Sequence, residues 1–179
     1  MKNYFKKIII VFSCLLSSLI SSLILSLISS LIFSASAQEL QGKFQDWSVF
    51  KINHNNKIVC YIASIPIGTS GNIKKEGEPF FLVTKINEDS DEISSSLGAI
   101  IASNSNAELS IGNQKYVLFP YQSMLWANNK TDDINIIKAM QQQADFTITA
   151  VLDNAKNFVD TYSLIGFNES YQLMKKICK

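Results

Sequence analysis

Arginine is absent from this sequence, and all 16 basic residues are lysines. Because only a guanidinium group offers a planar fork for carboxylates and phosphates, its absence argues against a dedicated phosphate or nucleotide site. Histidine occurs once, at His54, in an Asn-rich segment that predicts a solvated turn. A Ser-His-Asp triad is therefore not expected, and the sequence has no Gly-x-Ser-x-Gly motif.

Side chains that bind metal ions are also scarce, with one histidine and three cysteines in the whole chain. The densest acidic cluster could attract calcium, but it lacks the glycine and the bidentate glutamate of an EF-hand loop. We interpret this cluster as a solvated turn; it contains Glu88, Asp89, Asp91 and Glu92. The sequence thus predicts no catalytic residue, no cofactor and no metal site.

Long apolar runs are confined to the N-terminus. Lysines at positions 2, 6 and 7 precede an apolar segment over residues 8–33, and Ala35-Ser36-Ala37 follows it. This layout is typical of a secretory signal peptide, here residues 1–37, with cleavage between Ala37 and Gln38. An uncleaved membrane anchor over residues 8–33 is the alternative, because about 20 apolar residues span a bilayer. A lipoprotein signal through Cys14 fits less well, because bulky Phe12 stands where a small residue is needed.

Cleavage would leave residues 38–179, which is the size of one domain. This part holds 13 lysines and all 15 acidic residues, a net charge of −2. No basic surface for nucleic acid is expected.

Two cysteines remain in the mature chain, Cys60 and Cys178. An even pair in an oxidising compartment predicts a disulfide, here closing a loop that spans most of the mature chain. For such a loop the chain-entropy model gives about 4 to 5 kcal/mol of stabilisation. Two unpaired buried thiols are the alternative, and neither cysteine belongs to a Cys-x-x-Cys motif.

Short apolar and β-branched runs recur between turn signals and predict strands. They cover residues 44–52, 57–66, 80–86, part of 92–101, 107–111, 114–119, 124–127, 146–152 and 158–165, with a polar loop over 68–79. The pair Gly112-Asn113 fits a type II′ hairpin turn. A helix capped by Thr131 or Asp132 and a last helix capped by Asn168 complete the prediction. We therefore expect an all-β, antiparallel sandwich or partly closed barrel with one internal and one C-terminal helix.

Aromatic residues at strand positions most often fill the core. Trp47, Trp126 and the pair Phe80-Phe81 are interpreted in this way, with a ligand pocket as the alternative.

Several motifs occur in the order in which one known family has them. They are Phe44-x-Asp46-Trp47-Ser48-Val49, Cys60-Tyr61-Ile62-Ala63-Ser64-x-Pro66, Phe80 to Thr84, Asp91 to Ser94, Trp126-Ala127, Lys138 to Met140 and Asp160-Thr161-Tyr162-Ser163-Leu164-x-Gly166-Phe167. The mature chain resembles the invasion-associated locus B family of exported alphaproteobacterial proteins. It departs from the family at Gln45, at Phe50-Lys51 and at Gln142-Gln143, where relatives often have Gly, Cys and Gly.

The resemblance implies a β-rich exported protein that is not an enzyme and is linked with entry into host cells. The motif residues are expected to have structural roles, and they are Asp46, Trp47, Trp126, Asp160, Tyr162, Ser163, Gly166 and Phe167. Within the last motif, Tyr162, Leu164 and Phe167 should pack inward, and Asp160, Thr161 and Ser163 should satisfy neighbouring backbone groups near the last helix. A binding epitope is the alternative.

Two hypotheses for the function follow. The first is an interaction protein of the periplasm or cell surface that binds a host or envelope protein, does not bind nucleic acid, and meets the membrane only through its N-terminal segment. The second is a periplasmic small-molecule binding module or weak hydrolase.

Overall fold

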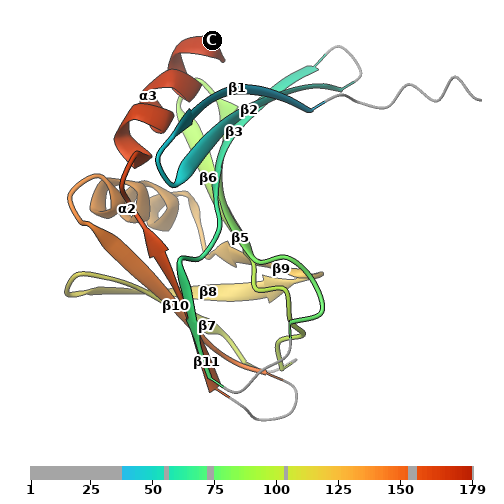
Figure 1. Ribbon diagram of the computed structural model, residues 1–179, viewed down its shortest axis with the longest axis vertical. Helices are drawn as coiled ribbons and strands as arrows, with labels where there is room; N and C mark the ends of the chain where they lie inside the picture. Colours follow the sequence, from blue (N-terminus) through green and yellow to red (C-terminus); the bar gives the residue numbers. More distant parts are fainter. Residues whose placement is uncertain (1–37, 55–56, 72–74, 103–104, 153–156, 179) are drawn as a thin grey trace, which may run out of the picture. The chain divides into compact units, whose positions relative to one another are not determined.

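The computed structural model describes residues 38–54, 57–71, 75–102, 105–152 and 157–178. In these residues eleven strands form one antiparallel sheet, which is not closed into a barrel, and two helices pack on it (Figure 1). The strands follow the order β1-β2-β3-β5-β6-β9-β8-β7-β10-β11-β4 across the sheet. Their bounds are β1 Gln38–Phe44, β2 Trp47–His54, β3 Lys57–Ser64, β4 Gly68–Ser70, β5 Phe80–Asn87, β6 Ser90–Ser96, β7 Ala107–Ile111, β8 Gln114–Tyr121, β9 Met124–Ala127, β10 Asp145–Val151 and β11 Asn157–Ser163. The helices are α2, Lys130–Met140, and α3, Phe167–Ile177. The predicted fold class, antiparallel all-β with one internal and one C-terminal helix, is confirmed.

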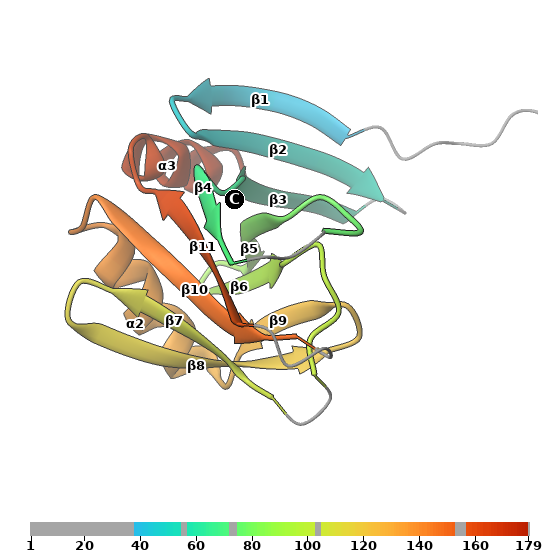
Figure 2. The same cartoon turned by 60° about the horizontal axis from the view of Figure 1, so that its bottom comes forward.

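The sheet folds over so that its two halves face each other as in a sandwich (Figure 2). Strands β5 and β10 are far apart in the strand order, yet the rings of Phe81 and Phe146 have centroids 4.8 Å apart. Phe146 in turn stacks on Tyr162 of β11, also at 4.8 Å. The core therefore lies between the two halves of a single sheet.

Two parts of the strand prediction were wrong. Residues 44–52 are not one strand, because the chain reverses after Phe44 and forms a β1–β2 hairpin that closes on the pair Phe44 and Trp47. Gln45 lies in the turn with φ 49°, a left-handed conformation that Gly adopts most readily. A glutamine at this position therefore gave no turn signal. The predicted loop over 68–79 contains β4, which pairs with β11.

The predicted hairpin at Gly112-Asn113 is confirmed. β7 and β8 pair in register up to Ile111 and Gln114, and Gly112 has φ 54°. The positive φ of Gly112 explains why this dipeptide was a strong turn signal in the sequence.

Both helix caps differ from the prediction. Helix α2 is capped by Asn129, whose side-chain oxygen accepts hydrogen bonds from the N–H groups of Thr131 at 2.9 Å and Asp132 at 3.1 Å. Helix α3 begins after Gly166, which has φ 89°. A Cβ atom on this residue would overlap the carbonyl oxygen of Phe44, so the close approach of the β1–β2 hairpin requires glycine there.

Helix α3 packs on β1, β2 and β3, and the residue that follows it contacts β3. Cys60 of β3 and Cys178 lie at disulfide distance, with Cα atoms 6.0 Å apart. Cys60 is completely buried. The Tyr171 hydroxyl donates to Asp91 Oδ2 at 2.5 Å and links the same helix to β6.

Neither described helix has the length and apolar character that a membrane-spanning helix needs. The predicted signal peptide, residues 1–37, and its cleavage residue Ala37 lie outside the described part of the chain. Gln38 is the first residue of β1.

Candidate functional site

Several motif residues meet where α3 begins, with Trp47, Ser163 and Phe167 buried there and the side chain of Asp46 exposed. Trp47 is completely buried, and its indole N–H donates to the carbonyl oxygen of Ser163 at 2.9 Å. Its ring packs edge-on against Phe167, with centroids 5.0 Å apart. The Ser163 hydroxyl oxygen accepts from the N–H of Ile165 at 3.1 Å. The backbone N–H of Asp46 donates to the carbonyl oxygen of Ile165 at 3.4 Å.

Asp160 has a different role from the one expected of it. Its buried carboxylate pairs with Lys75 Nζ, at 2.7 and 2.8 Å from its two oxygens, and no backbone group of the described residues donates to it. The Thr69 hydroxyl also donates to it, at 2.6 Å. Lys75 and Thr69 belong to the segment expected to be a loop, so the carboxylate fixes that segment against β11 and satisfies its own buried charge.

The aromatic residues that the sequence grouped together divide into two sets. Trp47 and Phe81 are completely buried in the core, as expected. Trp126 is only partly buried, and it lies on β9 between Ser94 of β6 and Phe119 of β8. Its indole nitrogen is shielded from solvent and has no hydrogen-bond partner among the described residues.

An open groove of about 500 Å³ lies beside Trp126, and we call it the aromatic groove. Residues paired across neighbouring strands point to the same face of a sheet, which places Trp126 and Phe119 side by side. Tyr121, two residues further along β8 and 60% exposed, shares that face. The opposite face of the same strands carries Leu118 and Leu125, which are buried in the core. The groove is therefore the uncovered side of β8 and β9.

Acidic side chains complete the lining of the aromatic groove. Glu92 enters it from β6, and Asp133 enters it from the first turn of α2. Asp133 is more than nine-tenths buried, and one of its oxygens accepts from the N–H of Ile93 at 2.9 Å. Burial raises the pKa of Asp133, and the nearby charges of Glu92, Asp132 and Asp91 raise it further, while the hydrogen bond from Ile93 opposes the shift.

This raised pKa predicts a pH effect on stability. An acid whose pKa is higher in the folded than in the unfolded state binds more protons when folded, so its contribution to the free energy of unfolding falls as pH rises through that interval. Asp133→Asn keeps an acceptor for Ile93 and removes the charge. We expect its stability relative to the native chain to increase as pH rises from about 4 to 7.

Urea denaturation at several pH values measures this difference. Asp89→Asn, which changes an exposed turn residue, is the matched control for the loss of one negative charge. A difference between Asp133→Asn and the native chain that stays constant with pH, or that shrinks as pH rises, would contradict the assignment.

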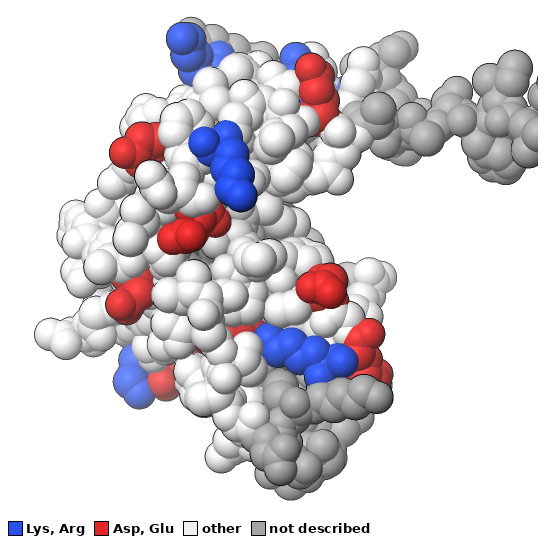
Figure 3. Space-filling view, viewed as in Figure 1, with Lys and Arg blue, Asp and Glu red and all other residues white. Residues whose placement is uncertain are grey.

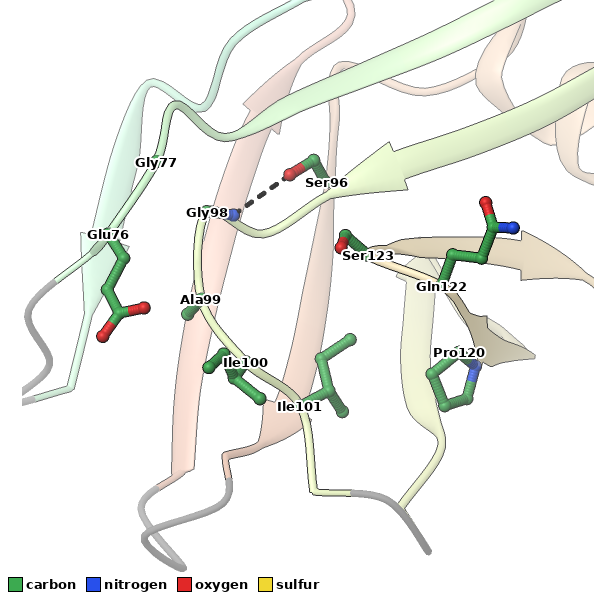
Figure 4. Close-up of a pocket in the computed structure, with 10 residues that line it drawn as sticks. All are labelled: Glu76, Gly77, Ser96, Gly98, Ala99, Ile100, Ile101, Pro120, Gln122 and Ser123. Atoms are coloured by element: carbon green, nitrogen blue, oxygen red, sulfur yellow. Dashed lines mark hydrogen bonds between the residues drawn. The ribbon is translucent and has the colours of Figure 1, made fainter.

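A second hollow of about 320 Å³ lies at the end of the sheet, between the segment after β6 and the β8–β9 turn (Figure 4). Gly98 accepts hydrogen bonds from the N–H groups of Glu76 and Gly77, at 2.7 and 3.1 Å, and this holds the two loops together. Of the residues that line it, Glu76 is the one with a titratable side chain, and Ser96 and Ser123 contribute hydroxyl groups.

The remaining candidates from the sequence do not come together. His54 ends β2, its side chain is outside the described atoms, and so are Asn55 and Asn56. Glu88 and Asp89 lie in the exposed β5–β6 turn, whereas Asp91 and Glu92 lie within β6. The described residues contain no group of three or more His, Cys, Asp or Glu side chains arranged to hold a metal ion. On the face seen in Figure 3, acidic and basic side chains are scattered among uncharged ones.

Comparisons with known proteins identify a shared fold. The structure is similar to the crystal structure of invasion associated protein B from Bartonella henselae, with a TM-score of 0.56 over 79% of this chain and 97% of that one. The two chains are 12% identical over the match. No family model and no curated protein matches the sequence. The similarity therefore shows a shared fold.

The sequence reasoning missed the groove residues Phe119, Tyr121 and Asp133. A signal was present, because Val117, Phe119 and Tyr121 occupy alternate positions of β8 and therefore share one face of that strand. That face is apolar, and Leu118 lies on the opposite face. The sequence of the strand does not determine which of its two faces the rest of the chain covers.

Proposed function

We propose that this protein is an exported, non-enzymatic interaction protein that binds a protein partner through the aromatic groove, with a role in contact between the bacterium and a host cell. One observation supports the binding surface above all. Phe119, Tyr121 and Trp126 form an apolar face that the rest of the described chain leaves open. Exposed aromatic residues next to polar ones are the usual anchors of protein interfaces.

The proposed cellular role rests on other observations. The sequence motifs resemble a family of exported proteins, and the fold is shared with invasion associated protein B. The N-terminal lysines, apolar run and Ala-Ser-Ala segment supply an export signal. Two cysteines at disulfide distance suit a compartment outside the cytoplasm.

Photo-crosslinking in living cells tests the proposal. A benzoylphenylalanine is introduced at Tyr121, inside the groove, and at Ile165, which is equally exposed at 60% but lies after β11. Irradiation in the presence of host cells, followed by fractionation, should yield a discrete adduct from position 121 in the periplasmic, surface or secreted fraction. Its protein chain should begin at Gln38.

Position 165 is the matched control and should give no adduct of the same size. Equal labelling from both positions, or none from position 121, would contradict the proposal that a partner in cells binds through the groove. Recovery of the chain only in the cytoplasm would contradict export.

A further inference from the structure

The charges around the aromatic groove are unequal. Glu92 and Asp133 line it, and the charge of Asp132 lies close enough to raise the pKa of Asp133, whereas Asp91 is paired with Lys85 Nζ at 3.8 Å. Among the residues that line the groove, one is basic: Lys130, whose side chain is exposed at the start of α2. The groove thus combines aromatic walls with an excess of negative charge.

We propose that the aromatic groove binds a basic, extended segment of a partner protein, with lysine or arginine side chains held between its aromatic rings and Glu92. This inference rests on the proposed function and adds the chemistry of the partner. A cation over an aromatic face gains electrostatic attraction from the ring, and the aliphatic part of its side chain packs on the apolar walls. A carboxylate beside the rings strengthens the attraction, because the walls of a groove lower the local dielectric constant.

The protein uses the same type of contact within its own structure. Lys175 Nζ lies 5.4 Å from the centre of the Tyr171 ring, and Lys75 Nζ lies 5.9 Å from the centre of the Phe158 ring. Neither ring lines the aromatic groove, whose aromatic residues have no lysine placed over them among the described side chains. The groove therefore offers rings and carboxylates to a cation from outside.

The indole N–H of Trp126 lacks an acceptor among the described residues, but it is shielded from solvent. The contact proposed for Trp126 is therefore made by the face of its ring and not by its N–H group.

The start of helix α2 does not turn the groove into an anion site. Asn129 already accepts hydrogen bonds from the first-turn N–H groups of Thr131 and Asp132. The carboxylates of Asp132 and Asp133 also offset the positive end of the helix dipole.

Tryptophan fluorescence provides a direct test with the full chain. The protein has two tryptophans, and Trp47 is completely buried, so a change in emission on binding reports on Trp126. The probe is a capped peptide in which lysines alternate with leucine and glycine, and its matched control carries glutamine in place of every lysine. We expect a saturable change with the lysine peptide, weakening as salt rises from about 0.02 to 0.5 M, and no saturable change with the glutamine peptide.

Glu92→Gln should raise the dissociation constant of the lysine peptide by about five-fold or more. Asp133→Asn should act in the same direction, and thermal unfolding will show that each variant is folded. Glu108→Gln removes a carboxylate from β7, outside the groove, and should leave the affinity unchanged.

Similar binding of the lysine and glutamine peptides, or equal effects of Glu92→Gln and Glu108→Gln, would overturn the inference. If the lysine peptide fails to bind although position 121 captures a partner in cells, the proposed function stands and the basic chemistry is wrong. If the lysine peptide binds as expected but position 121 captures nothing, the groove chemistry stands and the cellular role is wrong.

Discussion

Replacing both Cys60 and Cys178 by alanine is expected to lower the free energy of unfolding by about 4 to 5 kcal/mol. The two residues are separated by 118 positions, so the bond restricts the unfolded chain over most of its length. In the folded state it joins the last turn of α3 to β3, the third strand in the order across the sheet. Because small domains have a total stability of about 5 to 15 kcal/mol, the loss would leave little margin.

Urea denaturation of the native chain and the double variant, each with and without reductant, measures this effect. The reductant should destabilise the native chain by about as much as the two substitutions do. The double variant is the control, because its stability should not respond to reductant. Purified, non-reduced protein from the bacterial envelope in which both thiols react freely with an alkylating agent would contradict the disulfide.

Trp47→Ala is expected to cost about 3 to 5 kcal/mol of stability. The side chain is fully buried and touches both halves of the folded sheet, through the Phe81 ring of β5 and the Ser163 carbonyl of β11. It also packs against Phe167 at the start of α3. Alanine would leave a cavity at the point where these three elements meet, together with a carbonyl group deprived of its donor.

Trp47→Phe separates the two contributions. Phenylalanine retains most of the ring contacts but cannot donate to Ser163, so we expect a cost of about 1 to 3 kcal/mol. Chemical denaturation followed by circular dichroism measures both variants. A cost for Trp47→Phe equal to that of Trp47→Ala would show that packing is not the larger part, and a cost below about 1 kcal/mol for Trp47→Ala would contradict the core position.

Much of the strand pattern was predictable because it depends on local chemistry. The alternation in residues 146–152 and the turn at Gly112-Asn113 each identify an element without reference to the rest of the chain. Some predictions failed where the local sequence carries no usual signal. Gln45 turns the chain without a turn residue, and Gly166 precedes α3 at a place where the backbone of Phe44 leaves no room for a Cβ atom.

The candidate site was less predictable than the fold. The sequence singled out Trp126 but grouped it with Trp47, and only the tertiary structure shows that one lines a groove while the other fills the core. The partner of Asp160 was missed for a similar reason, because Lys75 comes from a segment 85 positions away. Side-chain chemistry names a possible contact, but the partner depends on which strands become neighbours.

The sequence by itself determined the class of fold, the positions of most strands, the two cysteines available for pairing and the scarcity of catalytic side chains. These follow from composition and from periodicity over a few residues, because the geometry of a helix or a strand fixes which positions of a segment share a face. Only the tertiary structure decided that the sheet folds over on itself, that Asp133 lies beside Trp126, and that one face of β8 and β9 stays open. Both faces of that hairpin are apolar enough to be buried, and burial goes to the face that the remaining chain is able to cover.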